Sequence, residues 1–72
     1  MKKDIAVYGA GGFGKEVVCM INAINEVNPQ WNFIGFFDDG IEKGVKNIFG
    51  EILGGIETLN AWDKELHVVF SI

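Results

Sequence analysis

Six residues near the N-terminus have the spacing of a phosphate-binding turn. They match the pattern G-x-G-x-x-G, in the order Gly9, Ala10, Gly11, Gly12, Phe13 and Gly14. In such a turn the first glycine lets the chain reverse sharply, the second leaves room for a phosphate, and the third allows close packing of helix and strand. The free N–H groups that open a helix then bind an anion, with about 0.3 to 1 kcal/mol from the helix dipole. All six residues are therefore candidates to line a site for a phosphate-bearing ligand.

Two adjacent carboxylates and a serine are further candidates for the same site. Asp38 follows Gly14 by about 24 residues, where dinucleotide-binding folds place a carboxylate that binds a ribose, and it could equally bind another part of the nucleoside. Asp39 should point elsewhere, so we expect one of the pair to face the ligand and the other to begin a turn with Gly40, although Asp-Asp-Gly is also ordinary turn chemistry. Ser71 ends the last apolar segment, beside the crevice where open α/β sheets bind ligands.

No catalytic residue and no metal ligand is predicted in the chain. Cys19 is the single cysteine, so it forms no internal disulfide and matches no metal-ligand spacing. It falls on the polar side of a predicted helix with no base beside it, so we expect an accessible bystander. His67 has no carboxylate or serine placed by sequence to make it a general base, and we expect a surface histidine.

The elements that must position these residues alternate between strand and helix. Residues 5–8 form an apolar run without alternation, typical of a strand covered on both faces of a parallel sheet. After the glycines, apolar residues recur at helical spacing and predict a helix that ends near residues 25–28, before Pro29; these residues are Phe13, Val17, Ile21 and Ile24. Residues 31–37 are aromatic and apolar and predict a second strand.

The second half of the chain continues the alternation with shorter elements. Residues 38–50 are polar and rich in glycine, which indicates a mobile surface loop. Residues 52–53 predict a short strand, residues 56–62 a helix of about two turns, and residues 67–72 a last strand.

Together these elements predict an α/β domain with a Rossmann-like parallel sheet and helices on both faces. Right-handed connections would place strand 31–37 on one side of strand 5–8, and strand 67–72 on the other. Residues 1–72 make one domain, and a sheet that stops at this point lacks its second half. We therefore expect the chain to be the N-terminal piece of a longer protein.

Composition excludes several classes of protein. The net charge is −4 and the six basic residues are scattered, so nucleic acid is not an expected partner. No apolar run approaches the roughly 18 to 20 residues that span a bilayer, and Asp4 interrupts the N-terminus where a signal peptide would have its apolar core. We expect a cytoplasmic protein with a packed core.

Four segments together resemble a family of sugar acyltransferases. The segments are Gly-Ala-Gly-Gly-Phe-Gly-Lys-Glu-Val at 9–17, Ile-Gly-Phe-Phe-Asp-Asp at 34–39, Ile-Leu-Gly-Gly-Ile-Glu-Thr-Leu at 52–59 and Val-Val-Phe-Ser-Ile at 68–72. In this order they are similar to the N-terminal domain of sugar O-acyltransferases of the sialic acid O-acetyltransferase and bacillosamine N-acetyltransferase type. The glycine motif alone would not be specific.

The resemblance implies a Rossmann-like domain that binds a sugar substrate, often linked to UDP. It places the glycine turn near the phosphates or sugar, and Asp38 with Asp39 near the nucleoside. In that family acetyl-CoA binds a C-terminal left-handed β-helix, which also carries the catalytic histidine and forms the homotrimer. His67 does not inherit that role, and this piece by itself is expected to bind no cofactor and to transfer no acetyl group.

The leading hypothesis is therefore the substrate-binding domain of a nucleotide-sugar acetyltransferase. One alternative is the NAD-binding half of an oxidoreductase, because the glycine motif with Asp38 satisfies that fingerprint as well. Another is a Rossmann-like interaction module that binds no nucleotide, because fold does not dictate function. The sequence leaves open the identity of the sugar and the choice between oxygen and nitrogen as the acylated atom.

Overall fold

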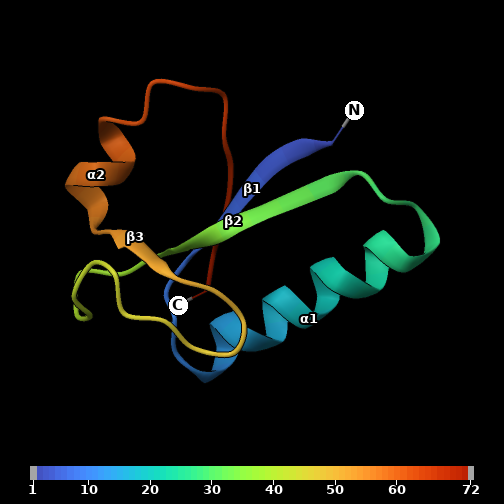
Figure 1. The fold of residues 1–72 in the computed structure, drawn as a ribbon, viewed down its shortest axis with the longest axis horizontal. Helices are drawn as coiled ribbons and strands as arrows, with labels where there is room; N and C mark the ends of the chain where they lie inside the picture. The colour runs from blue at the N-terminus through green and yellow to red at the C-terminus, as the bar shows by residue number, and fades with distance from the viewer. Residues whose placement is uncertain (1, 72) are drawn as a thin grey trace.

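The computed structural model describes residues 2–71. Its four strands form one parallel sheet in the order β3-β2-β1-β4, and Figure 1 labels the first three of these strands with the two helices. The strands are β1 (Lys3–Tyr8), β2 (Trp31–Phe37), β3 (Ile52–Gly54) and β4 (His67–Phe70), and the helices are α1 (Gly12–Val27) and α2 (Ile56–Asn60). The Rossmann-like sheet is thus confirmed, with β2 and β4 on opposite sides of β1 as right-handed connections require.

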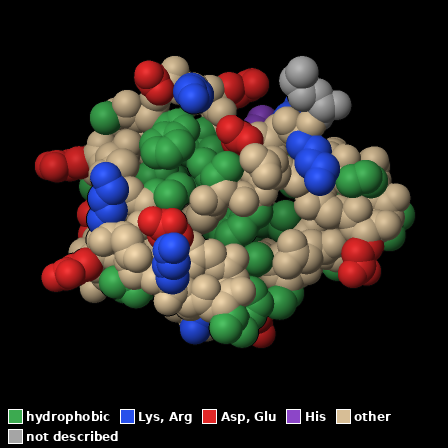
Figure 2. Space-filling view, viewed as in Figure 1, with side chains coloured by type: hydrophobic (Ala, Val, Ile, Leu, Met, Phe, Trp, Pro, Cys, Tyr) green, Lys and Arg blue, Asp and Glu red, His purple; other side chains and the backbone are tan. Residues whose placement is uncertain are grey.

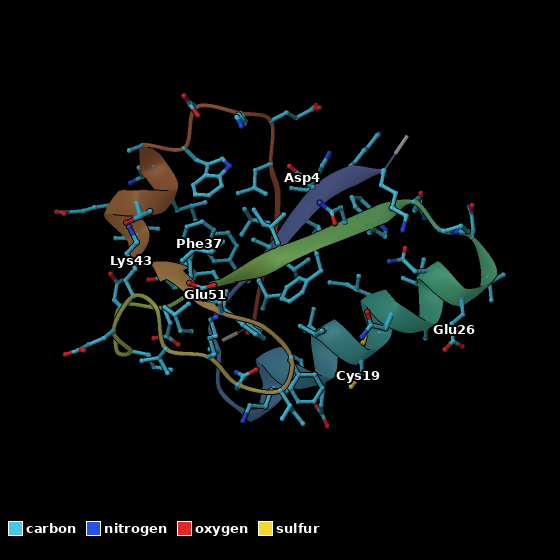
Figure 3. All side chains as sticks on the ribbon, in the orientation of Figure 1. Asp4, Cys19, Glu26, Phe37, Lys43 and Glu51 are labelled. Atoms are coloured by element: carbon cyan, nitrogen blue, oxygen red, sulfur yellow. The ribbon has the colours of Figure 1, made fainter. Side chains whose placement is uncertain are left out.

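The two faces of the sheet carry different helices. Val7 and Phe36 are fully buried in one core cluster with Val18 and Ile21 of α1. Phe37 is the next residue of β2, so its side chain points to the opposite face. There its ring meets Trp62, just after α2, edge-on at 5.5 Å between ring centroids (Figure 3). Helices therefore cover both faces, as predicted.

The buried side of α1 differs from the predicted apolar stripe. The helix buries Gly14, Val18 and Ile21, whereas Phe13 is 60% exposed and Ile24 44% exposed. The prediction was wrong at these two positions because α1 packs on β1 and β2, and no described element covers the adjoining face of β4. The exposed side chains line a groove of about 400 Å³ between α1 and β4.

The end of α1 is fixed by a side chain of its last turn. The Asn25 amide donates to the Trp31 carbonyl at 2.9 Å and accepts from the Gln30 and Trp31 N–H groups. These bonds hold the turn around Pro29, and the helix ends at Val27 within the predicted range. Cys19 and Glu26 point outward from the helix (Figure 3), so the expected accessibility of Cys19 is confirmed.

α2 ends two residues before the predicted limit, β3 extends one residue beyond its predicted limit, to Gly54, and β4 ends at Phe70, while the predicted end at residue 72 lies outside the described residues. The connection from β2 to β3 contains no helix. The chain between them makes one isolated antiparallel bridge, Lys46 to Glu51. The loop exposes the apolar side chains of Ile41, Val45 and Ile48. Figure 2 shows several apolar side chains at the surface on one side of the molecule, with charged side chains mostly around them.

His67 is not the surface histidine that was expected. It is half-buried on the α1 face because β4 pairs with β1 in the register that sets His67 opposite Ile5. Its ring meets Trp31 edge-on at 5.3 Å, and its Nε2 atom is buried without a hydrogen-bond partner among residues 2–71. Neither α1 nor α2 has the length and apolar character needed to cross a membrane.

Candidate nucleotide-binding turn

The candidate site lies at the carboxyl edge of the sheet, where β1 passes through the glycine turn into α1. Gly9 has a φ of +107°, a conformation that favours glycine, and its N–H donates to the Phe37 carbonyl at 2.8 Å. Gly14 approaches the same residue, because a Cβ at position 14 would lie 2.0 Å from the Gly9 carbonyl oxygen. These are the sharp turn and the close helix–strand packing that the sequence predicted.

The remaining glycines leave the helix start open. Gly11 is the N-cap residue with extended backbone, and no side chain of the described residues caps the helix. A Cβ at Gly11 or at Gly12 would meet nothing within 4 Å. Within the described part of the chain, the N–H groups of residues 11–14 donate no hydrogen bond to a protein acceptor. This edge therefore presents unpaired donors and the positive end of the helix dipole to an incoming group.

Asp38 joins the end of β2 to the glycine turn. Its Oδ2 accepts the Ala10 N–H at 2.9 Å, and its Oδ1 accepts the Gly40 N–H at 2.8 Å. The second bond is the turn that the Asp-Asp-Gly run predicted, and Asp38 is the member of the pair that makes it. Because each carboxylate oxygen has a further lone pair, Asp38 can still accept a bond from a ligand hydroxyl.

Asp39 points away from the glycine turn, toward α2. Its Oδ1 accepts the Ile56 N–H at 3.1 Å, and its Oδ2 accepts a hydrogen bond from the Tyr8 hydroxyl. The two carboxylates thus diverge, as predicted. The predicted division of roles was wrong, because Asp38 both bonds to the glycine turn and makes the turn with Gly40. Tyr8 was not predicted as a site residue, and its signal in the sequence is a hydroxyl-bearing aromatic at the end of the apolar run of residues 5–8.

This hydrogen bond shifts the pKa of both partners. The bond from Tyr8, and then the Ile56 N–H, lower the pKa of Asp39. The bond to Asp39, and then desolvation and the charges of Asp39 and Asp38, raise the pKa of Tyr8. The stabilisation from Asp39 is therefore present above its unfolded-state pKa and lost as the pH falls through its folded-state pKa. The stabilisation from Tyr8 is present below the unfolded-state pKa of Tyr8, and it is lost as the pH rises through its folded-state pKa.

Ser71 lies beneath the turn and bonds to its backbone. The residue is buried, and its hydroxyl faces the carbonyl oxygens of Gly9 at 2.9 Å and Tyr8 at 3.2 Å. The single hydroxyl proton of Ser71 is used by these two carbonyl oxygens. A ligand could therefore contact Ser71 only by donating a hydrogen bond to the lone pairs of its hydroxyl oxygen. The structure thus brings Ser71, the glycines and Asp38 together at one edge.

Replacement of Ser71 should reveal this supporting contact. We expect Ser71→Ala to lower the free energy of unfolding by about 1 kcal/mol, because the Gly9 carbonyl loses a buried donor. Urea denaturation followed by circular dichroism measures the change. Ser71→Cys, which is close in size and keeps a weak donor, is the matched control and should lose less. Equal stability of Ser71→Ala and the parent chain would contradict the assignment.

Fold and site together define a Rossmann-like domain with a glycine-rich turn that opens onto the carboxyl edge of a parallel sheet. Comparison with protein families agrees with this class, since the family model described as the PglD N-terminal domain matches residues 4–72. The chain therefore belongs to the PglD N-terminal domain family. No curated protein and no solved structure gives a significant match.

Proposed function

We propose that this domain binds the nucleotide-linked sugar substrate of an acetyltransferase, with the diphosphate at the glycine turn. The observation that carries the proposal is the open start of α1. There the N–H groups of residues 11–14 have no partner among residues 2–71, and the lack of side chains at Gly11 and Gly12 leaves space beside them. A diphosphate supplies the anionic oxygens that such donors bind. Membership of the PglD N-terminal domain family supports a sugar ligand over a redox cofactor.

The position of Asp38 supports a nucleoside next to the diphosphate. Its carboxylate is anchored to Ala10, within the glycine turn, so a ligand on the turn lies within reach of its free lone pairs. A ribose hydroxyl is a fitting donor for that position. Phe13 is largely exposed at the first turn of α1, where its ring can contact the sugar.

In the intact enzyme, we infer, this domain presents the sugar to a second domain. The resemblance to sugar acyltransferases suggests a left-handed β-helix that binds acetyl-CoA, supplies the catalytic base and forms a homotrimer. In that arrangement the base takes a proton from the sugar hydroxyl or amine while the sugar oxygen or nitrogen attacks the thioester carbonyl of acetyl-CoA. The new acyl bond replaces the C–S bond, and the base returns the proton to the leaving CoA thiolate. The residues described here would bind and orient the sugar nucleotide.

Titration with three ligands tests the proposal. We expect isothermal calorimetry to show saturable binding of UDP, at least about tenfold tighter than binding of NAD or of uridine. Uridine lacks the phosphates, so it is the matched control for the role of the N–H groups. Binding of UDP should also weaken as salt is added, because its charge is screened. Tight binding of NAD with none of UDP would favour a dehydrogenase-type domain, and no binding of either would favour an interaction module.

A further inference from the structure

The side chain of Tyr8 is held at both its ring and its hydroxyl. Tyr8 ends β1, and its ring stacks on that of Phe70 with 5.4 Å between centroids. Its hydroxyl donates a hydrogen bond to the carboxylate of Asp39, in the segment that follows β2. Tyr8 therefore ties together β1, β4 and the first residues after β2.

Asp39 extends this connection to α2. The N-cap residue of α2 is Gly55, which has no side chain to cap the helix, and the Asp39 carboxylate accepts the first helical N–H, that of Ile56. A Cβ at Gly55 would lie 2.1 Å from Asp39 Oδ1, so glycine is needed for this approach. Each oxygen of Asp39 thus has a donor from the protein, one from Tyr8 and one from α2.

Asp38 has a different set of partners, although it is the adjacent residue. One of its two donors is Ala10, which belongs to the glycine turn. Because the two residues share a peptide, a fixed position for Asp39 on the α2 side directs Asp38 toward the turn. The fold therefore holds both carboxylates by two donors each, Asp39 between Tyr8 and α2, and Asp38 at the candidate ligand site.

We propose that Tyr8 is a positioning residue of the nucleotide-sugar site, whose hydroxyl holds Asp39 against the start of α2 so that Asp38 alone of the two carboxylates contacts the ligand. The inference rests on the proposed function and deepens it, since it says which acidic residue recognises the nucleoside and what orients it. Tyr8 itself touches no ligand in this arrangement.

Binding of UDP by four variants of the chain tests the assignment. Tyr8→Phe keeps the ring on Phe70 and removes only the hydroxyl, and we expect about fivefold weaker binding. Asp39→Asn should weaken binding by a similar factor, and the double variant no further, because both changes disrupt the same hydrogen bond between the Tyr8 hydroxyl and the Asp39 carboxylate. Asp38→Asn should weaken binding by about tenfold or more, since it removes the negative charge of the group proposed to accept a hydrogen bond from a ribose hydroxyl.

The ionisation of Tyr8 gives a second readout that does not depend on a ligand. Tyr8 is the single tyrosine of the chain, so the phenolate absorbance band in an alkaline titration reports this residue alone. The parent chain should titrate above the ordinary pKa of tyrosine, and Asp39→Asn should bring the midpoint back toward that value. Asp38→Asn is the control and should move the midpoint least, because Asp38 acts on Tyr8 only through its charge, the smallest of the causes.

The outcomes separate this inference from the proposed function. Weaker UDP binding by Tyr8→Phe, together with a Tyr8 midpoint that depends on Asp39, supports it. If the parent chain binds UDP while Tyr8→Phe binds equally well, or if Asp39→Asn is the more damaging of the two aspartate variants, the inference is overturned and the proposed function stands. If the parent chain fails to bind UDP, the proposed function falls and the inference with it.

Discussion

Gly14→Ala should remove most of the stability of this domain. A Cβ at position 14 would lie 2.0 Å from the Gly9 carbonyl oxygen and 3.1 Å from Ser71 Oγ. Because the first of these neighbours is backbone, α1 must move away from β1, and we expect a loss of about 3 kcal/mol or more. That is a large part of the roughly 5 kcal/mol that a small domain has available. Thermal and urea denaturation followed by circular dichroism measure the loss.

Gly12→Ala is the matched control for this experiment. It makes the same chemical change two residues earlier in α1, where an added Cβ meets nothing within 4 Å. We expect it to leave stability unchanged or to raise it by up to about 1 kcal/mol, the usual gain of alanine over glycine in a helix. Similar melting temperatures for the two variants would show that the close approach of α1 to β1 is absent.

Gly11→Asp should change ligand binding and stability in opposite directions. The backbone of Gly11 is extended, with φ −70° and ψ −170°, and its Cβ position is open, so an aspartate can serve as N-cap without strain. Its carboxylate would accept a free N–H of the first turn, which raises stability by about 0.5 kcal/mol. The same carboxylate would occupy the proposed diphosphate position and repel it, and we expect about tenfold weaker binding of UDP or worse.

Gly11→Asn separates the blocked donor from the added charge. Asparagine caps a helix about as well as aspartate but carries no charge, so its loss of affinity should be smaller. The difference between the two variants should shrink as salt is added. Unchanged affinity in Gly11→Asp, measured by calorimetry in a chain that binds UDP, would place the diphosphate elsewhere.

The main elements and the turn between β1 and α1 could be predicted from the sequence because their signals are local. An unbroken apolar run marked β1, and an aromatic run bounded by Pro29 and Asp38 marked β2 with its observed limits. The spacing of the glycines predicted that the chain turns sharply at Gly9 and that helix and strand pack closely at Gly14. Periodicity of 3.6 residues located α1 but not the side it buries, because Phe13 and Ile24 would be buried only if an element covered the groove beside β4.

The partners of the polar side chains could not be predicted, because they come from segments far apart in the chain. The hydroxyl of Tyr8 and the carboxylate of Asp39 are 31 residues apart in the sequence. The position of His67 depends on the register between β4 and β1, which no local pattern specifies. The sequence could therefore predict that Asp38 and Asp39 are candidate site residues. Which partners each carboxylate has could be learned only from the structure.

The dependence of α2 on Asp39 has a consequence for the order of folding. A helix of five residues whose N-cap residue is glycine, with no side chain of its own to cap the helix, has almost no tendency to form in isolation. Its capping group comes from the segment after β2, which reaches its place only when β2 has paired with β1. We therefore expect α2 to be among the last elements to become structured, and its amide protons to exchange with solvent well before those of β1.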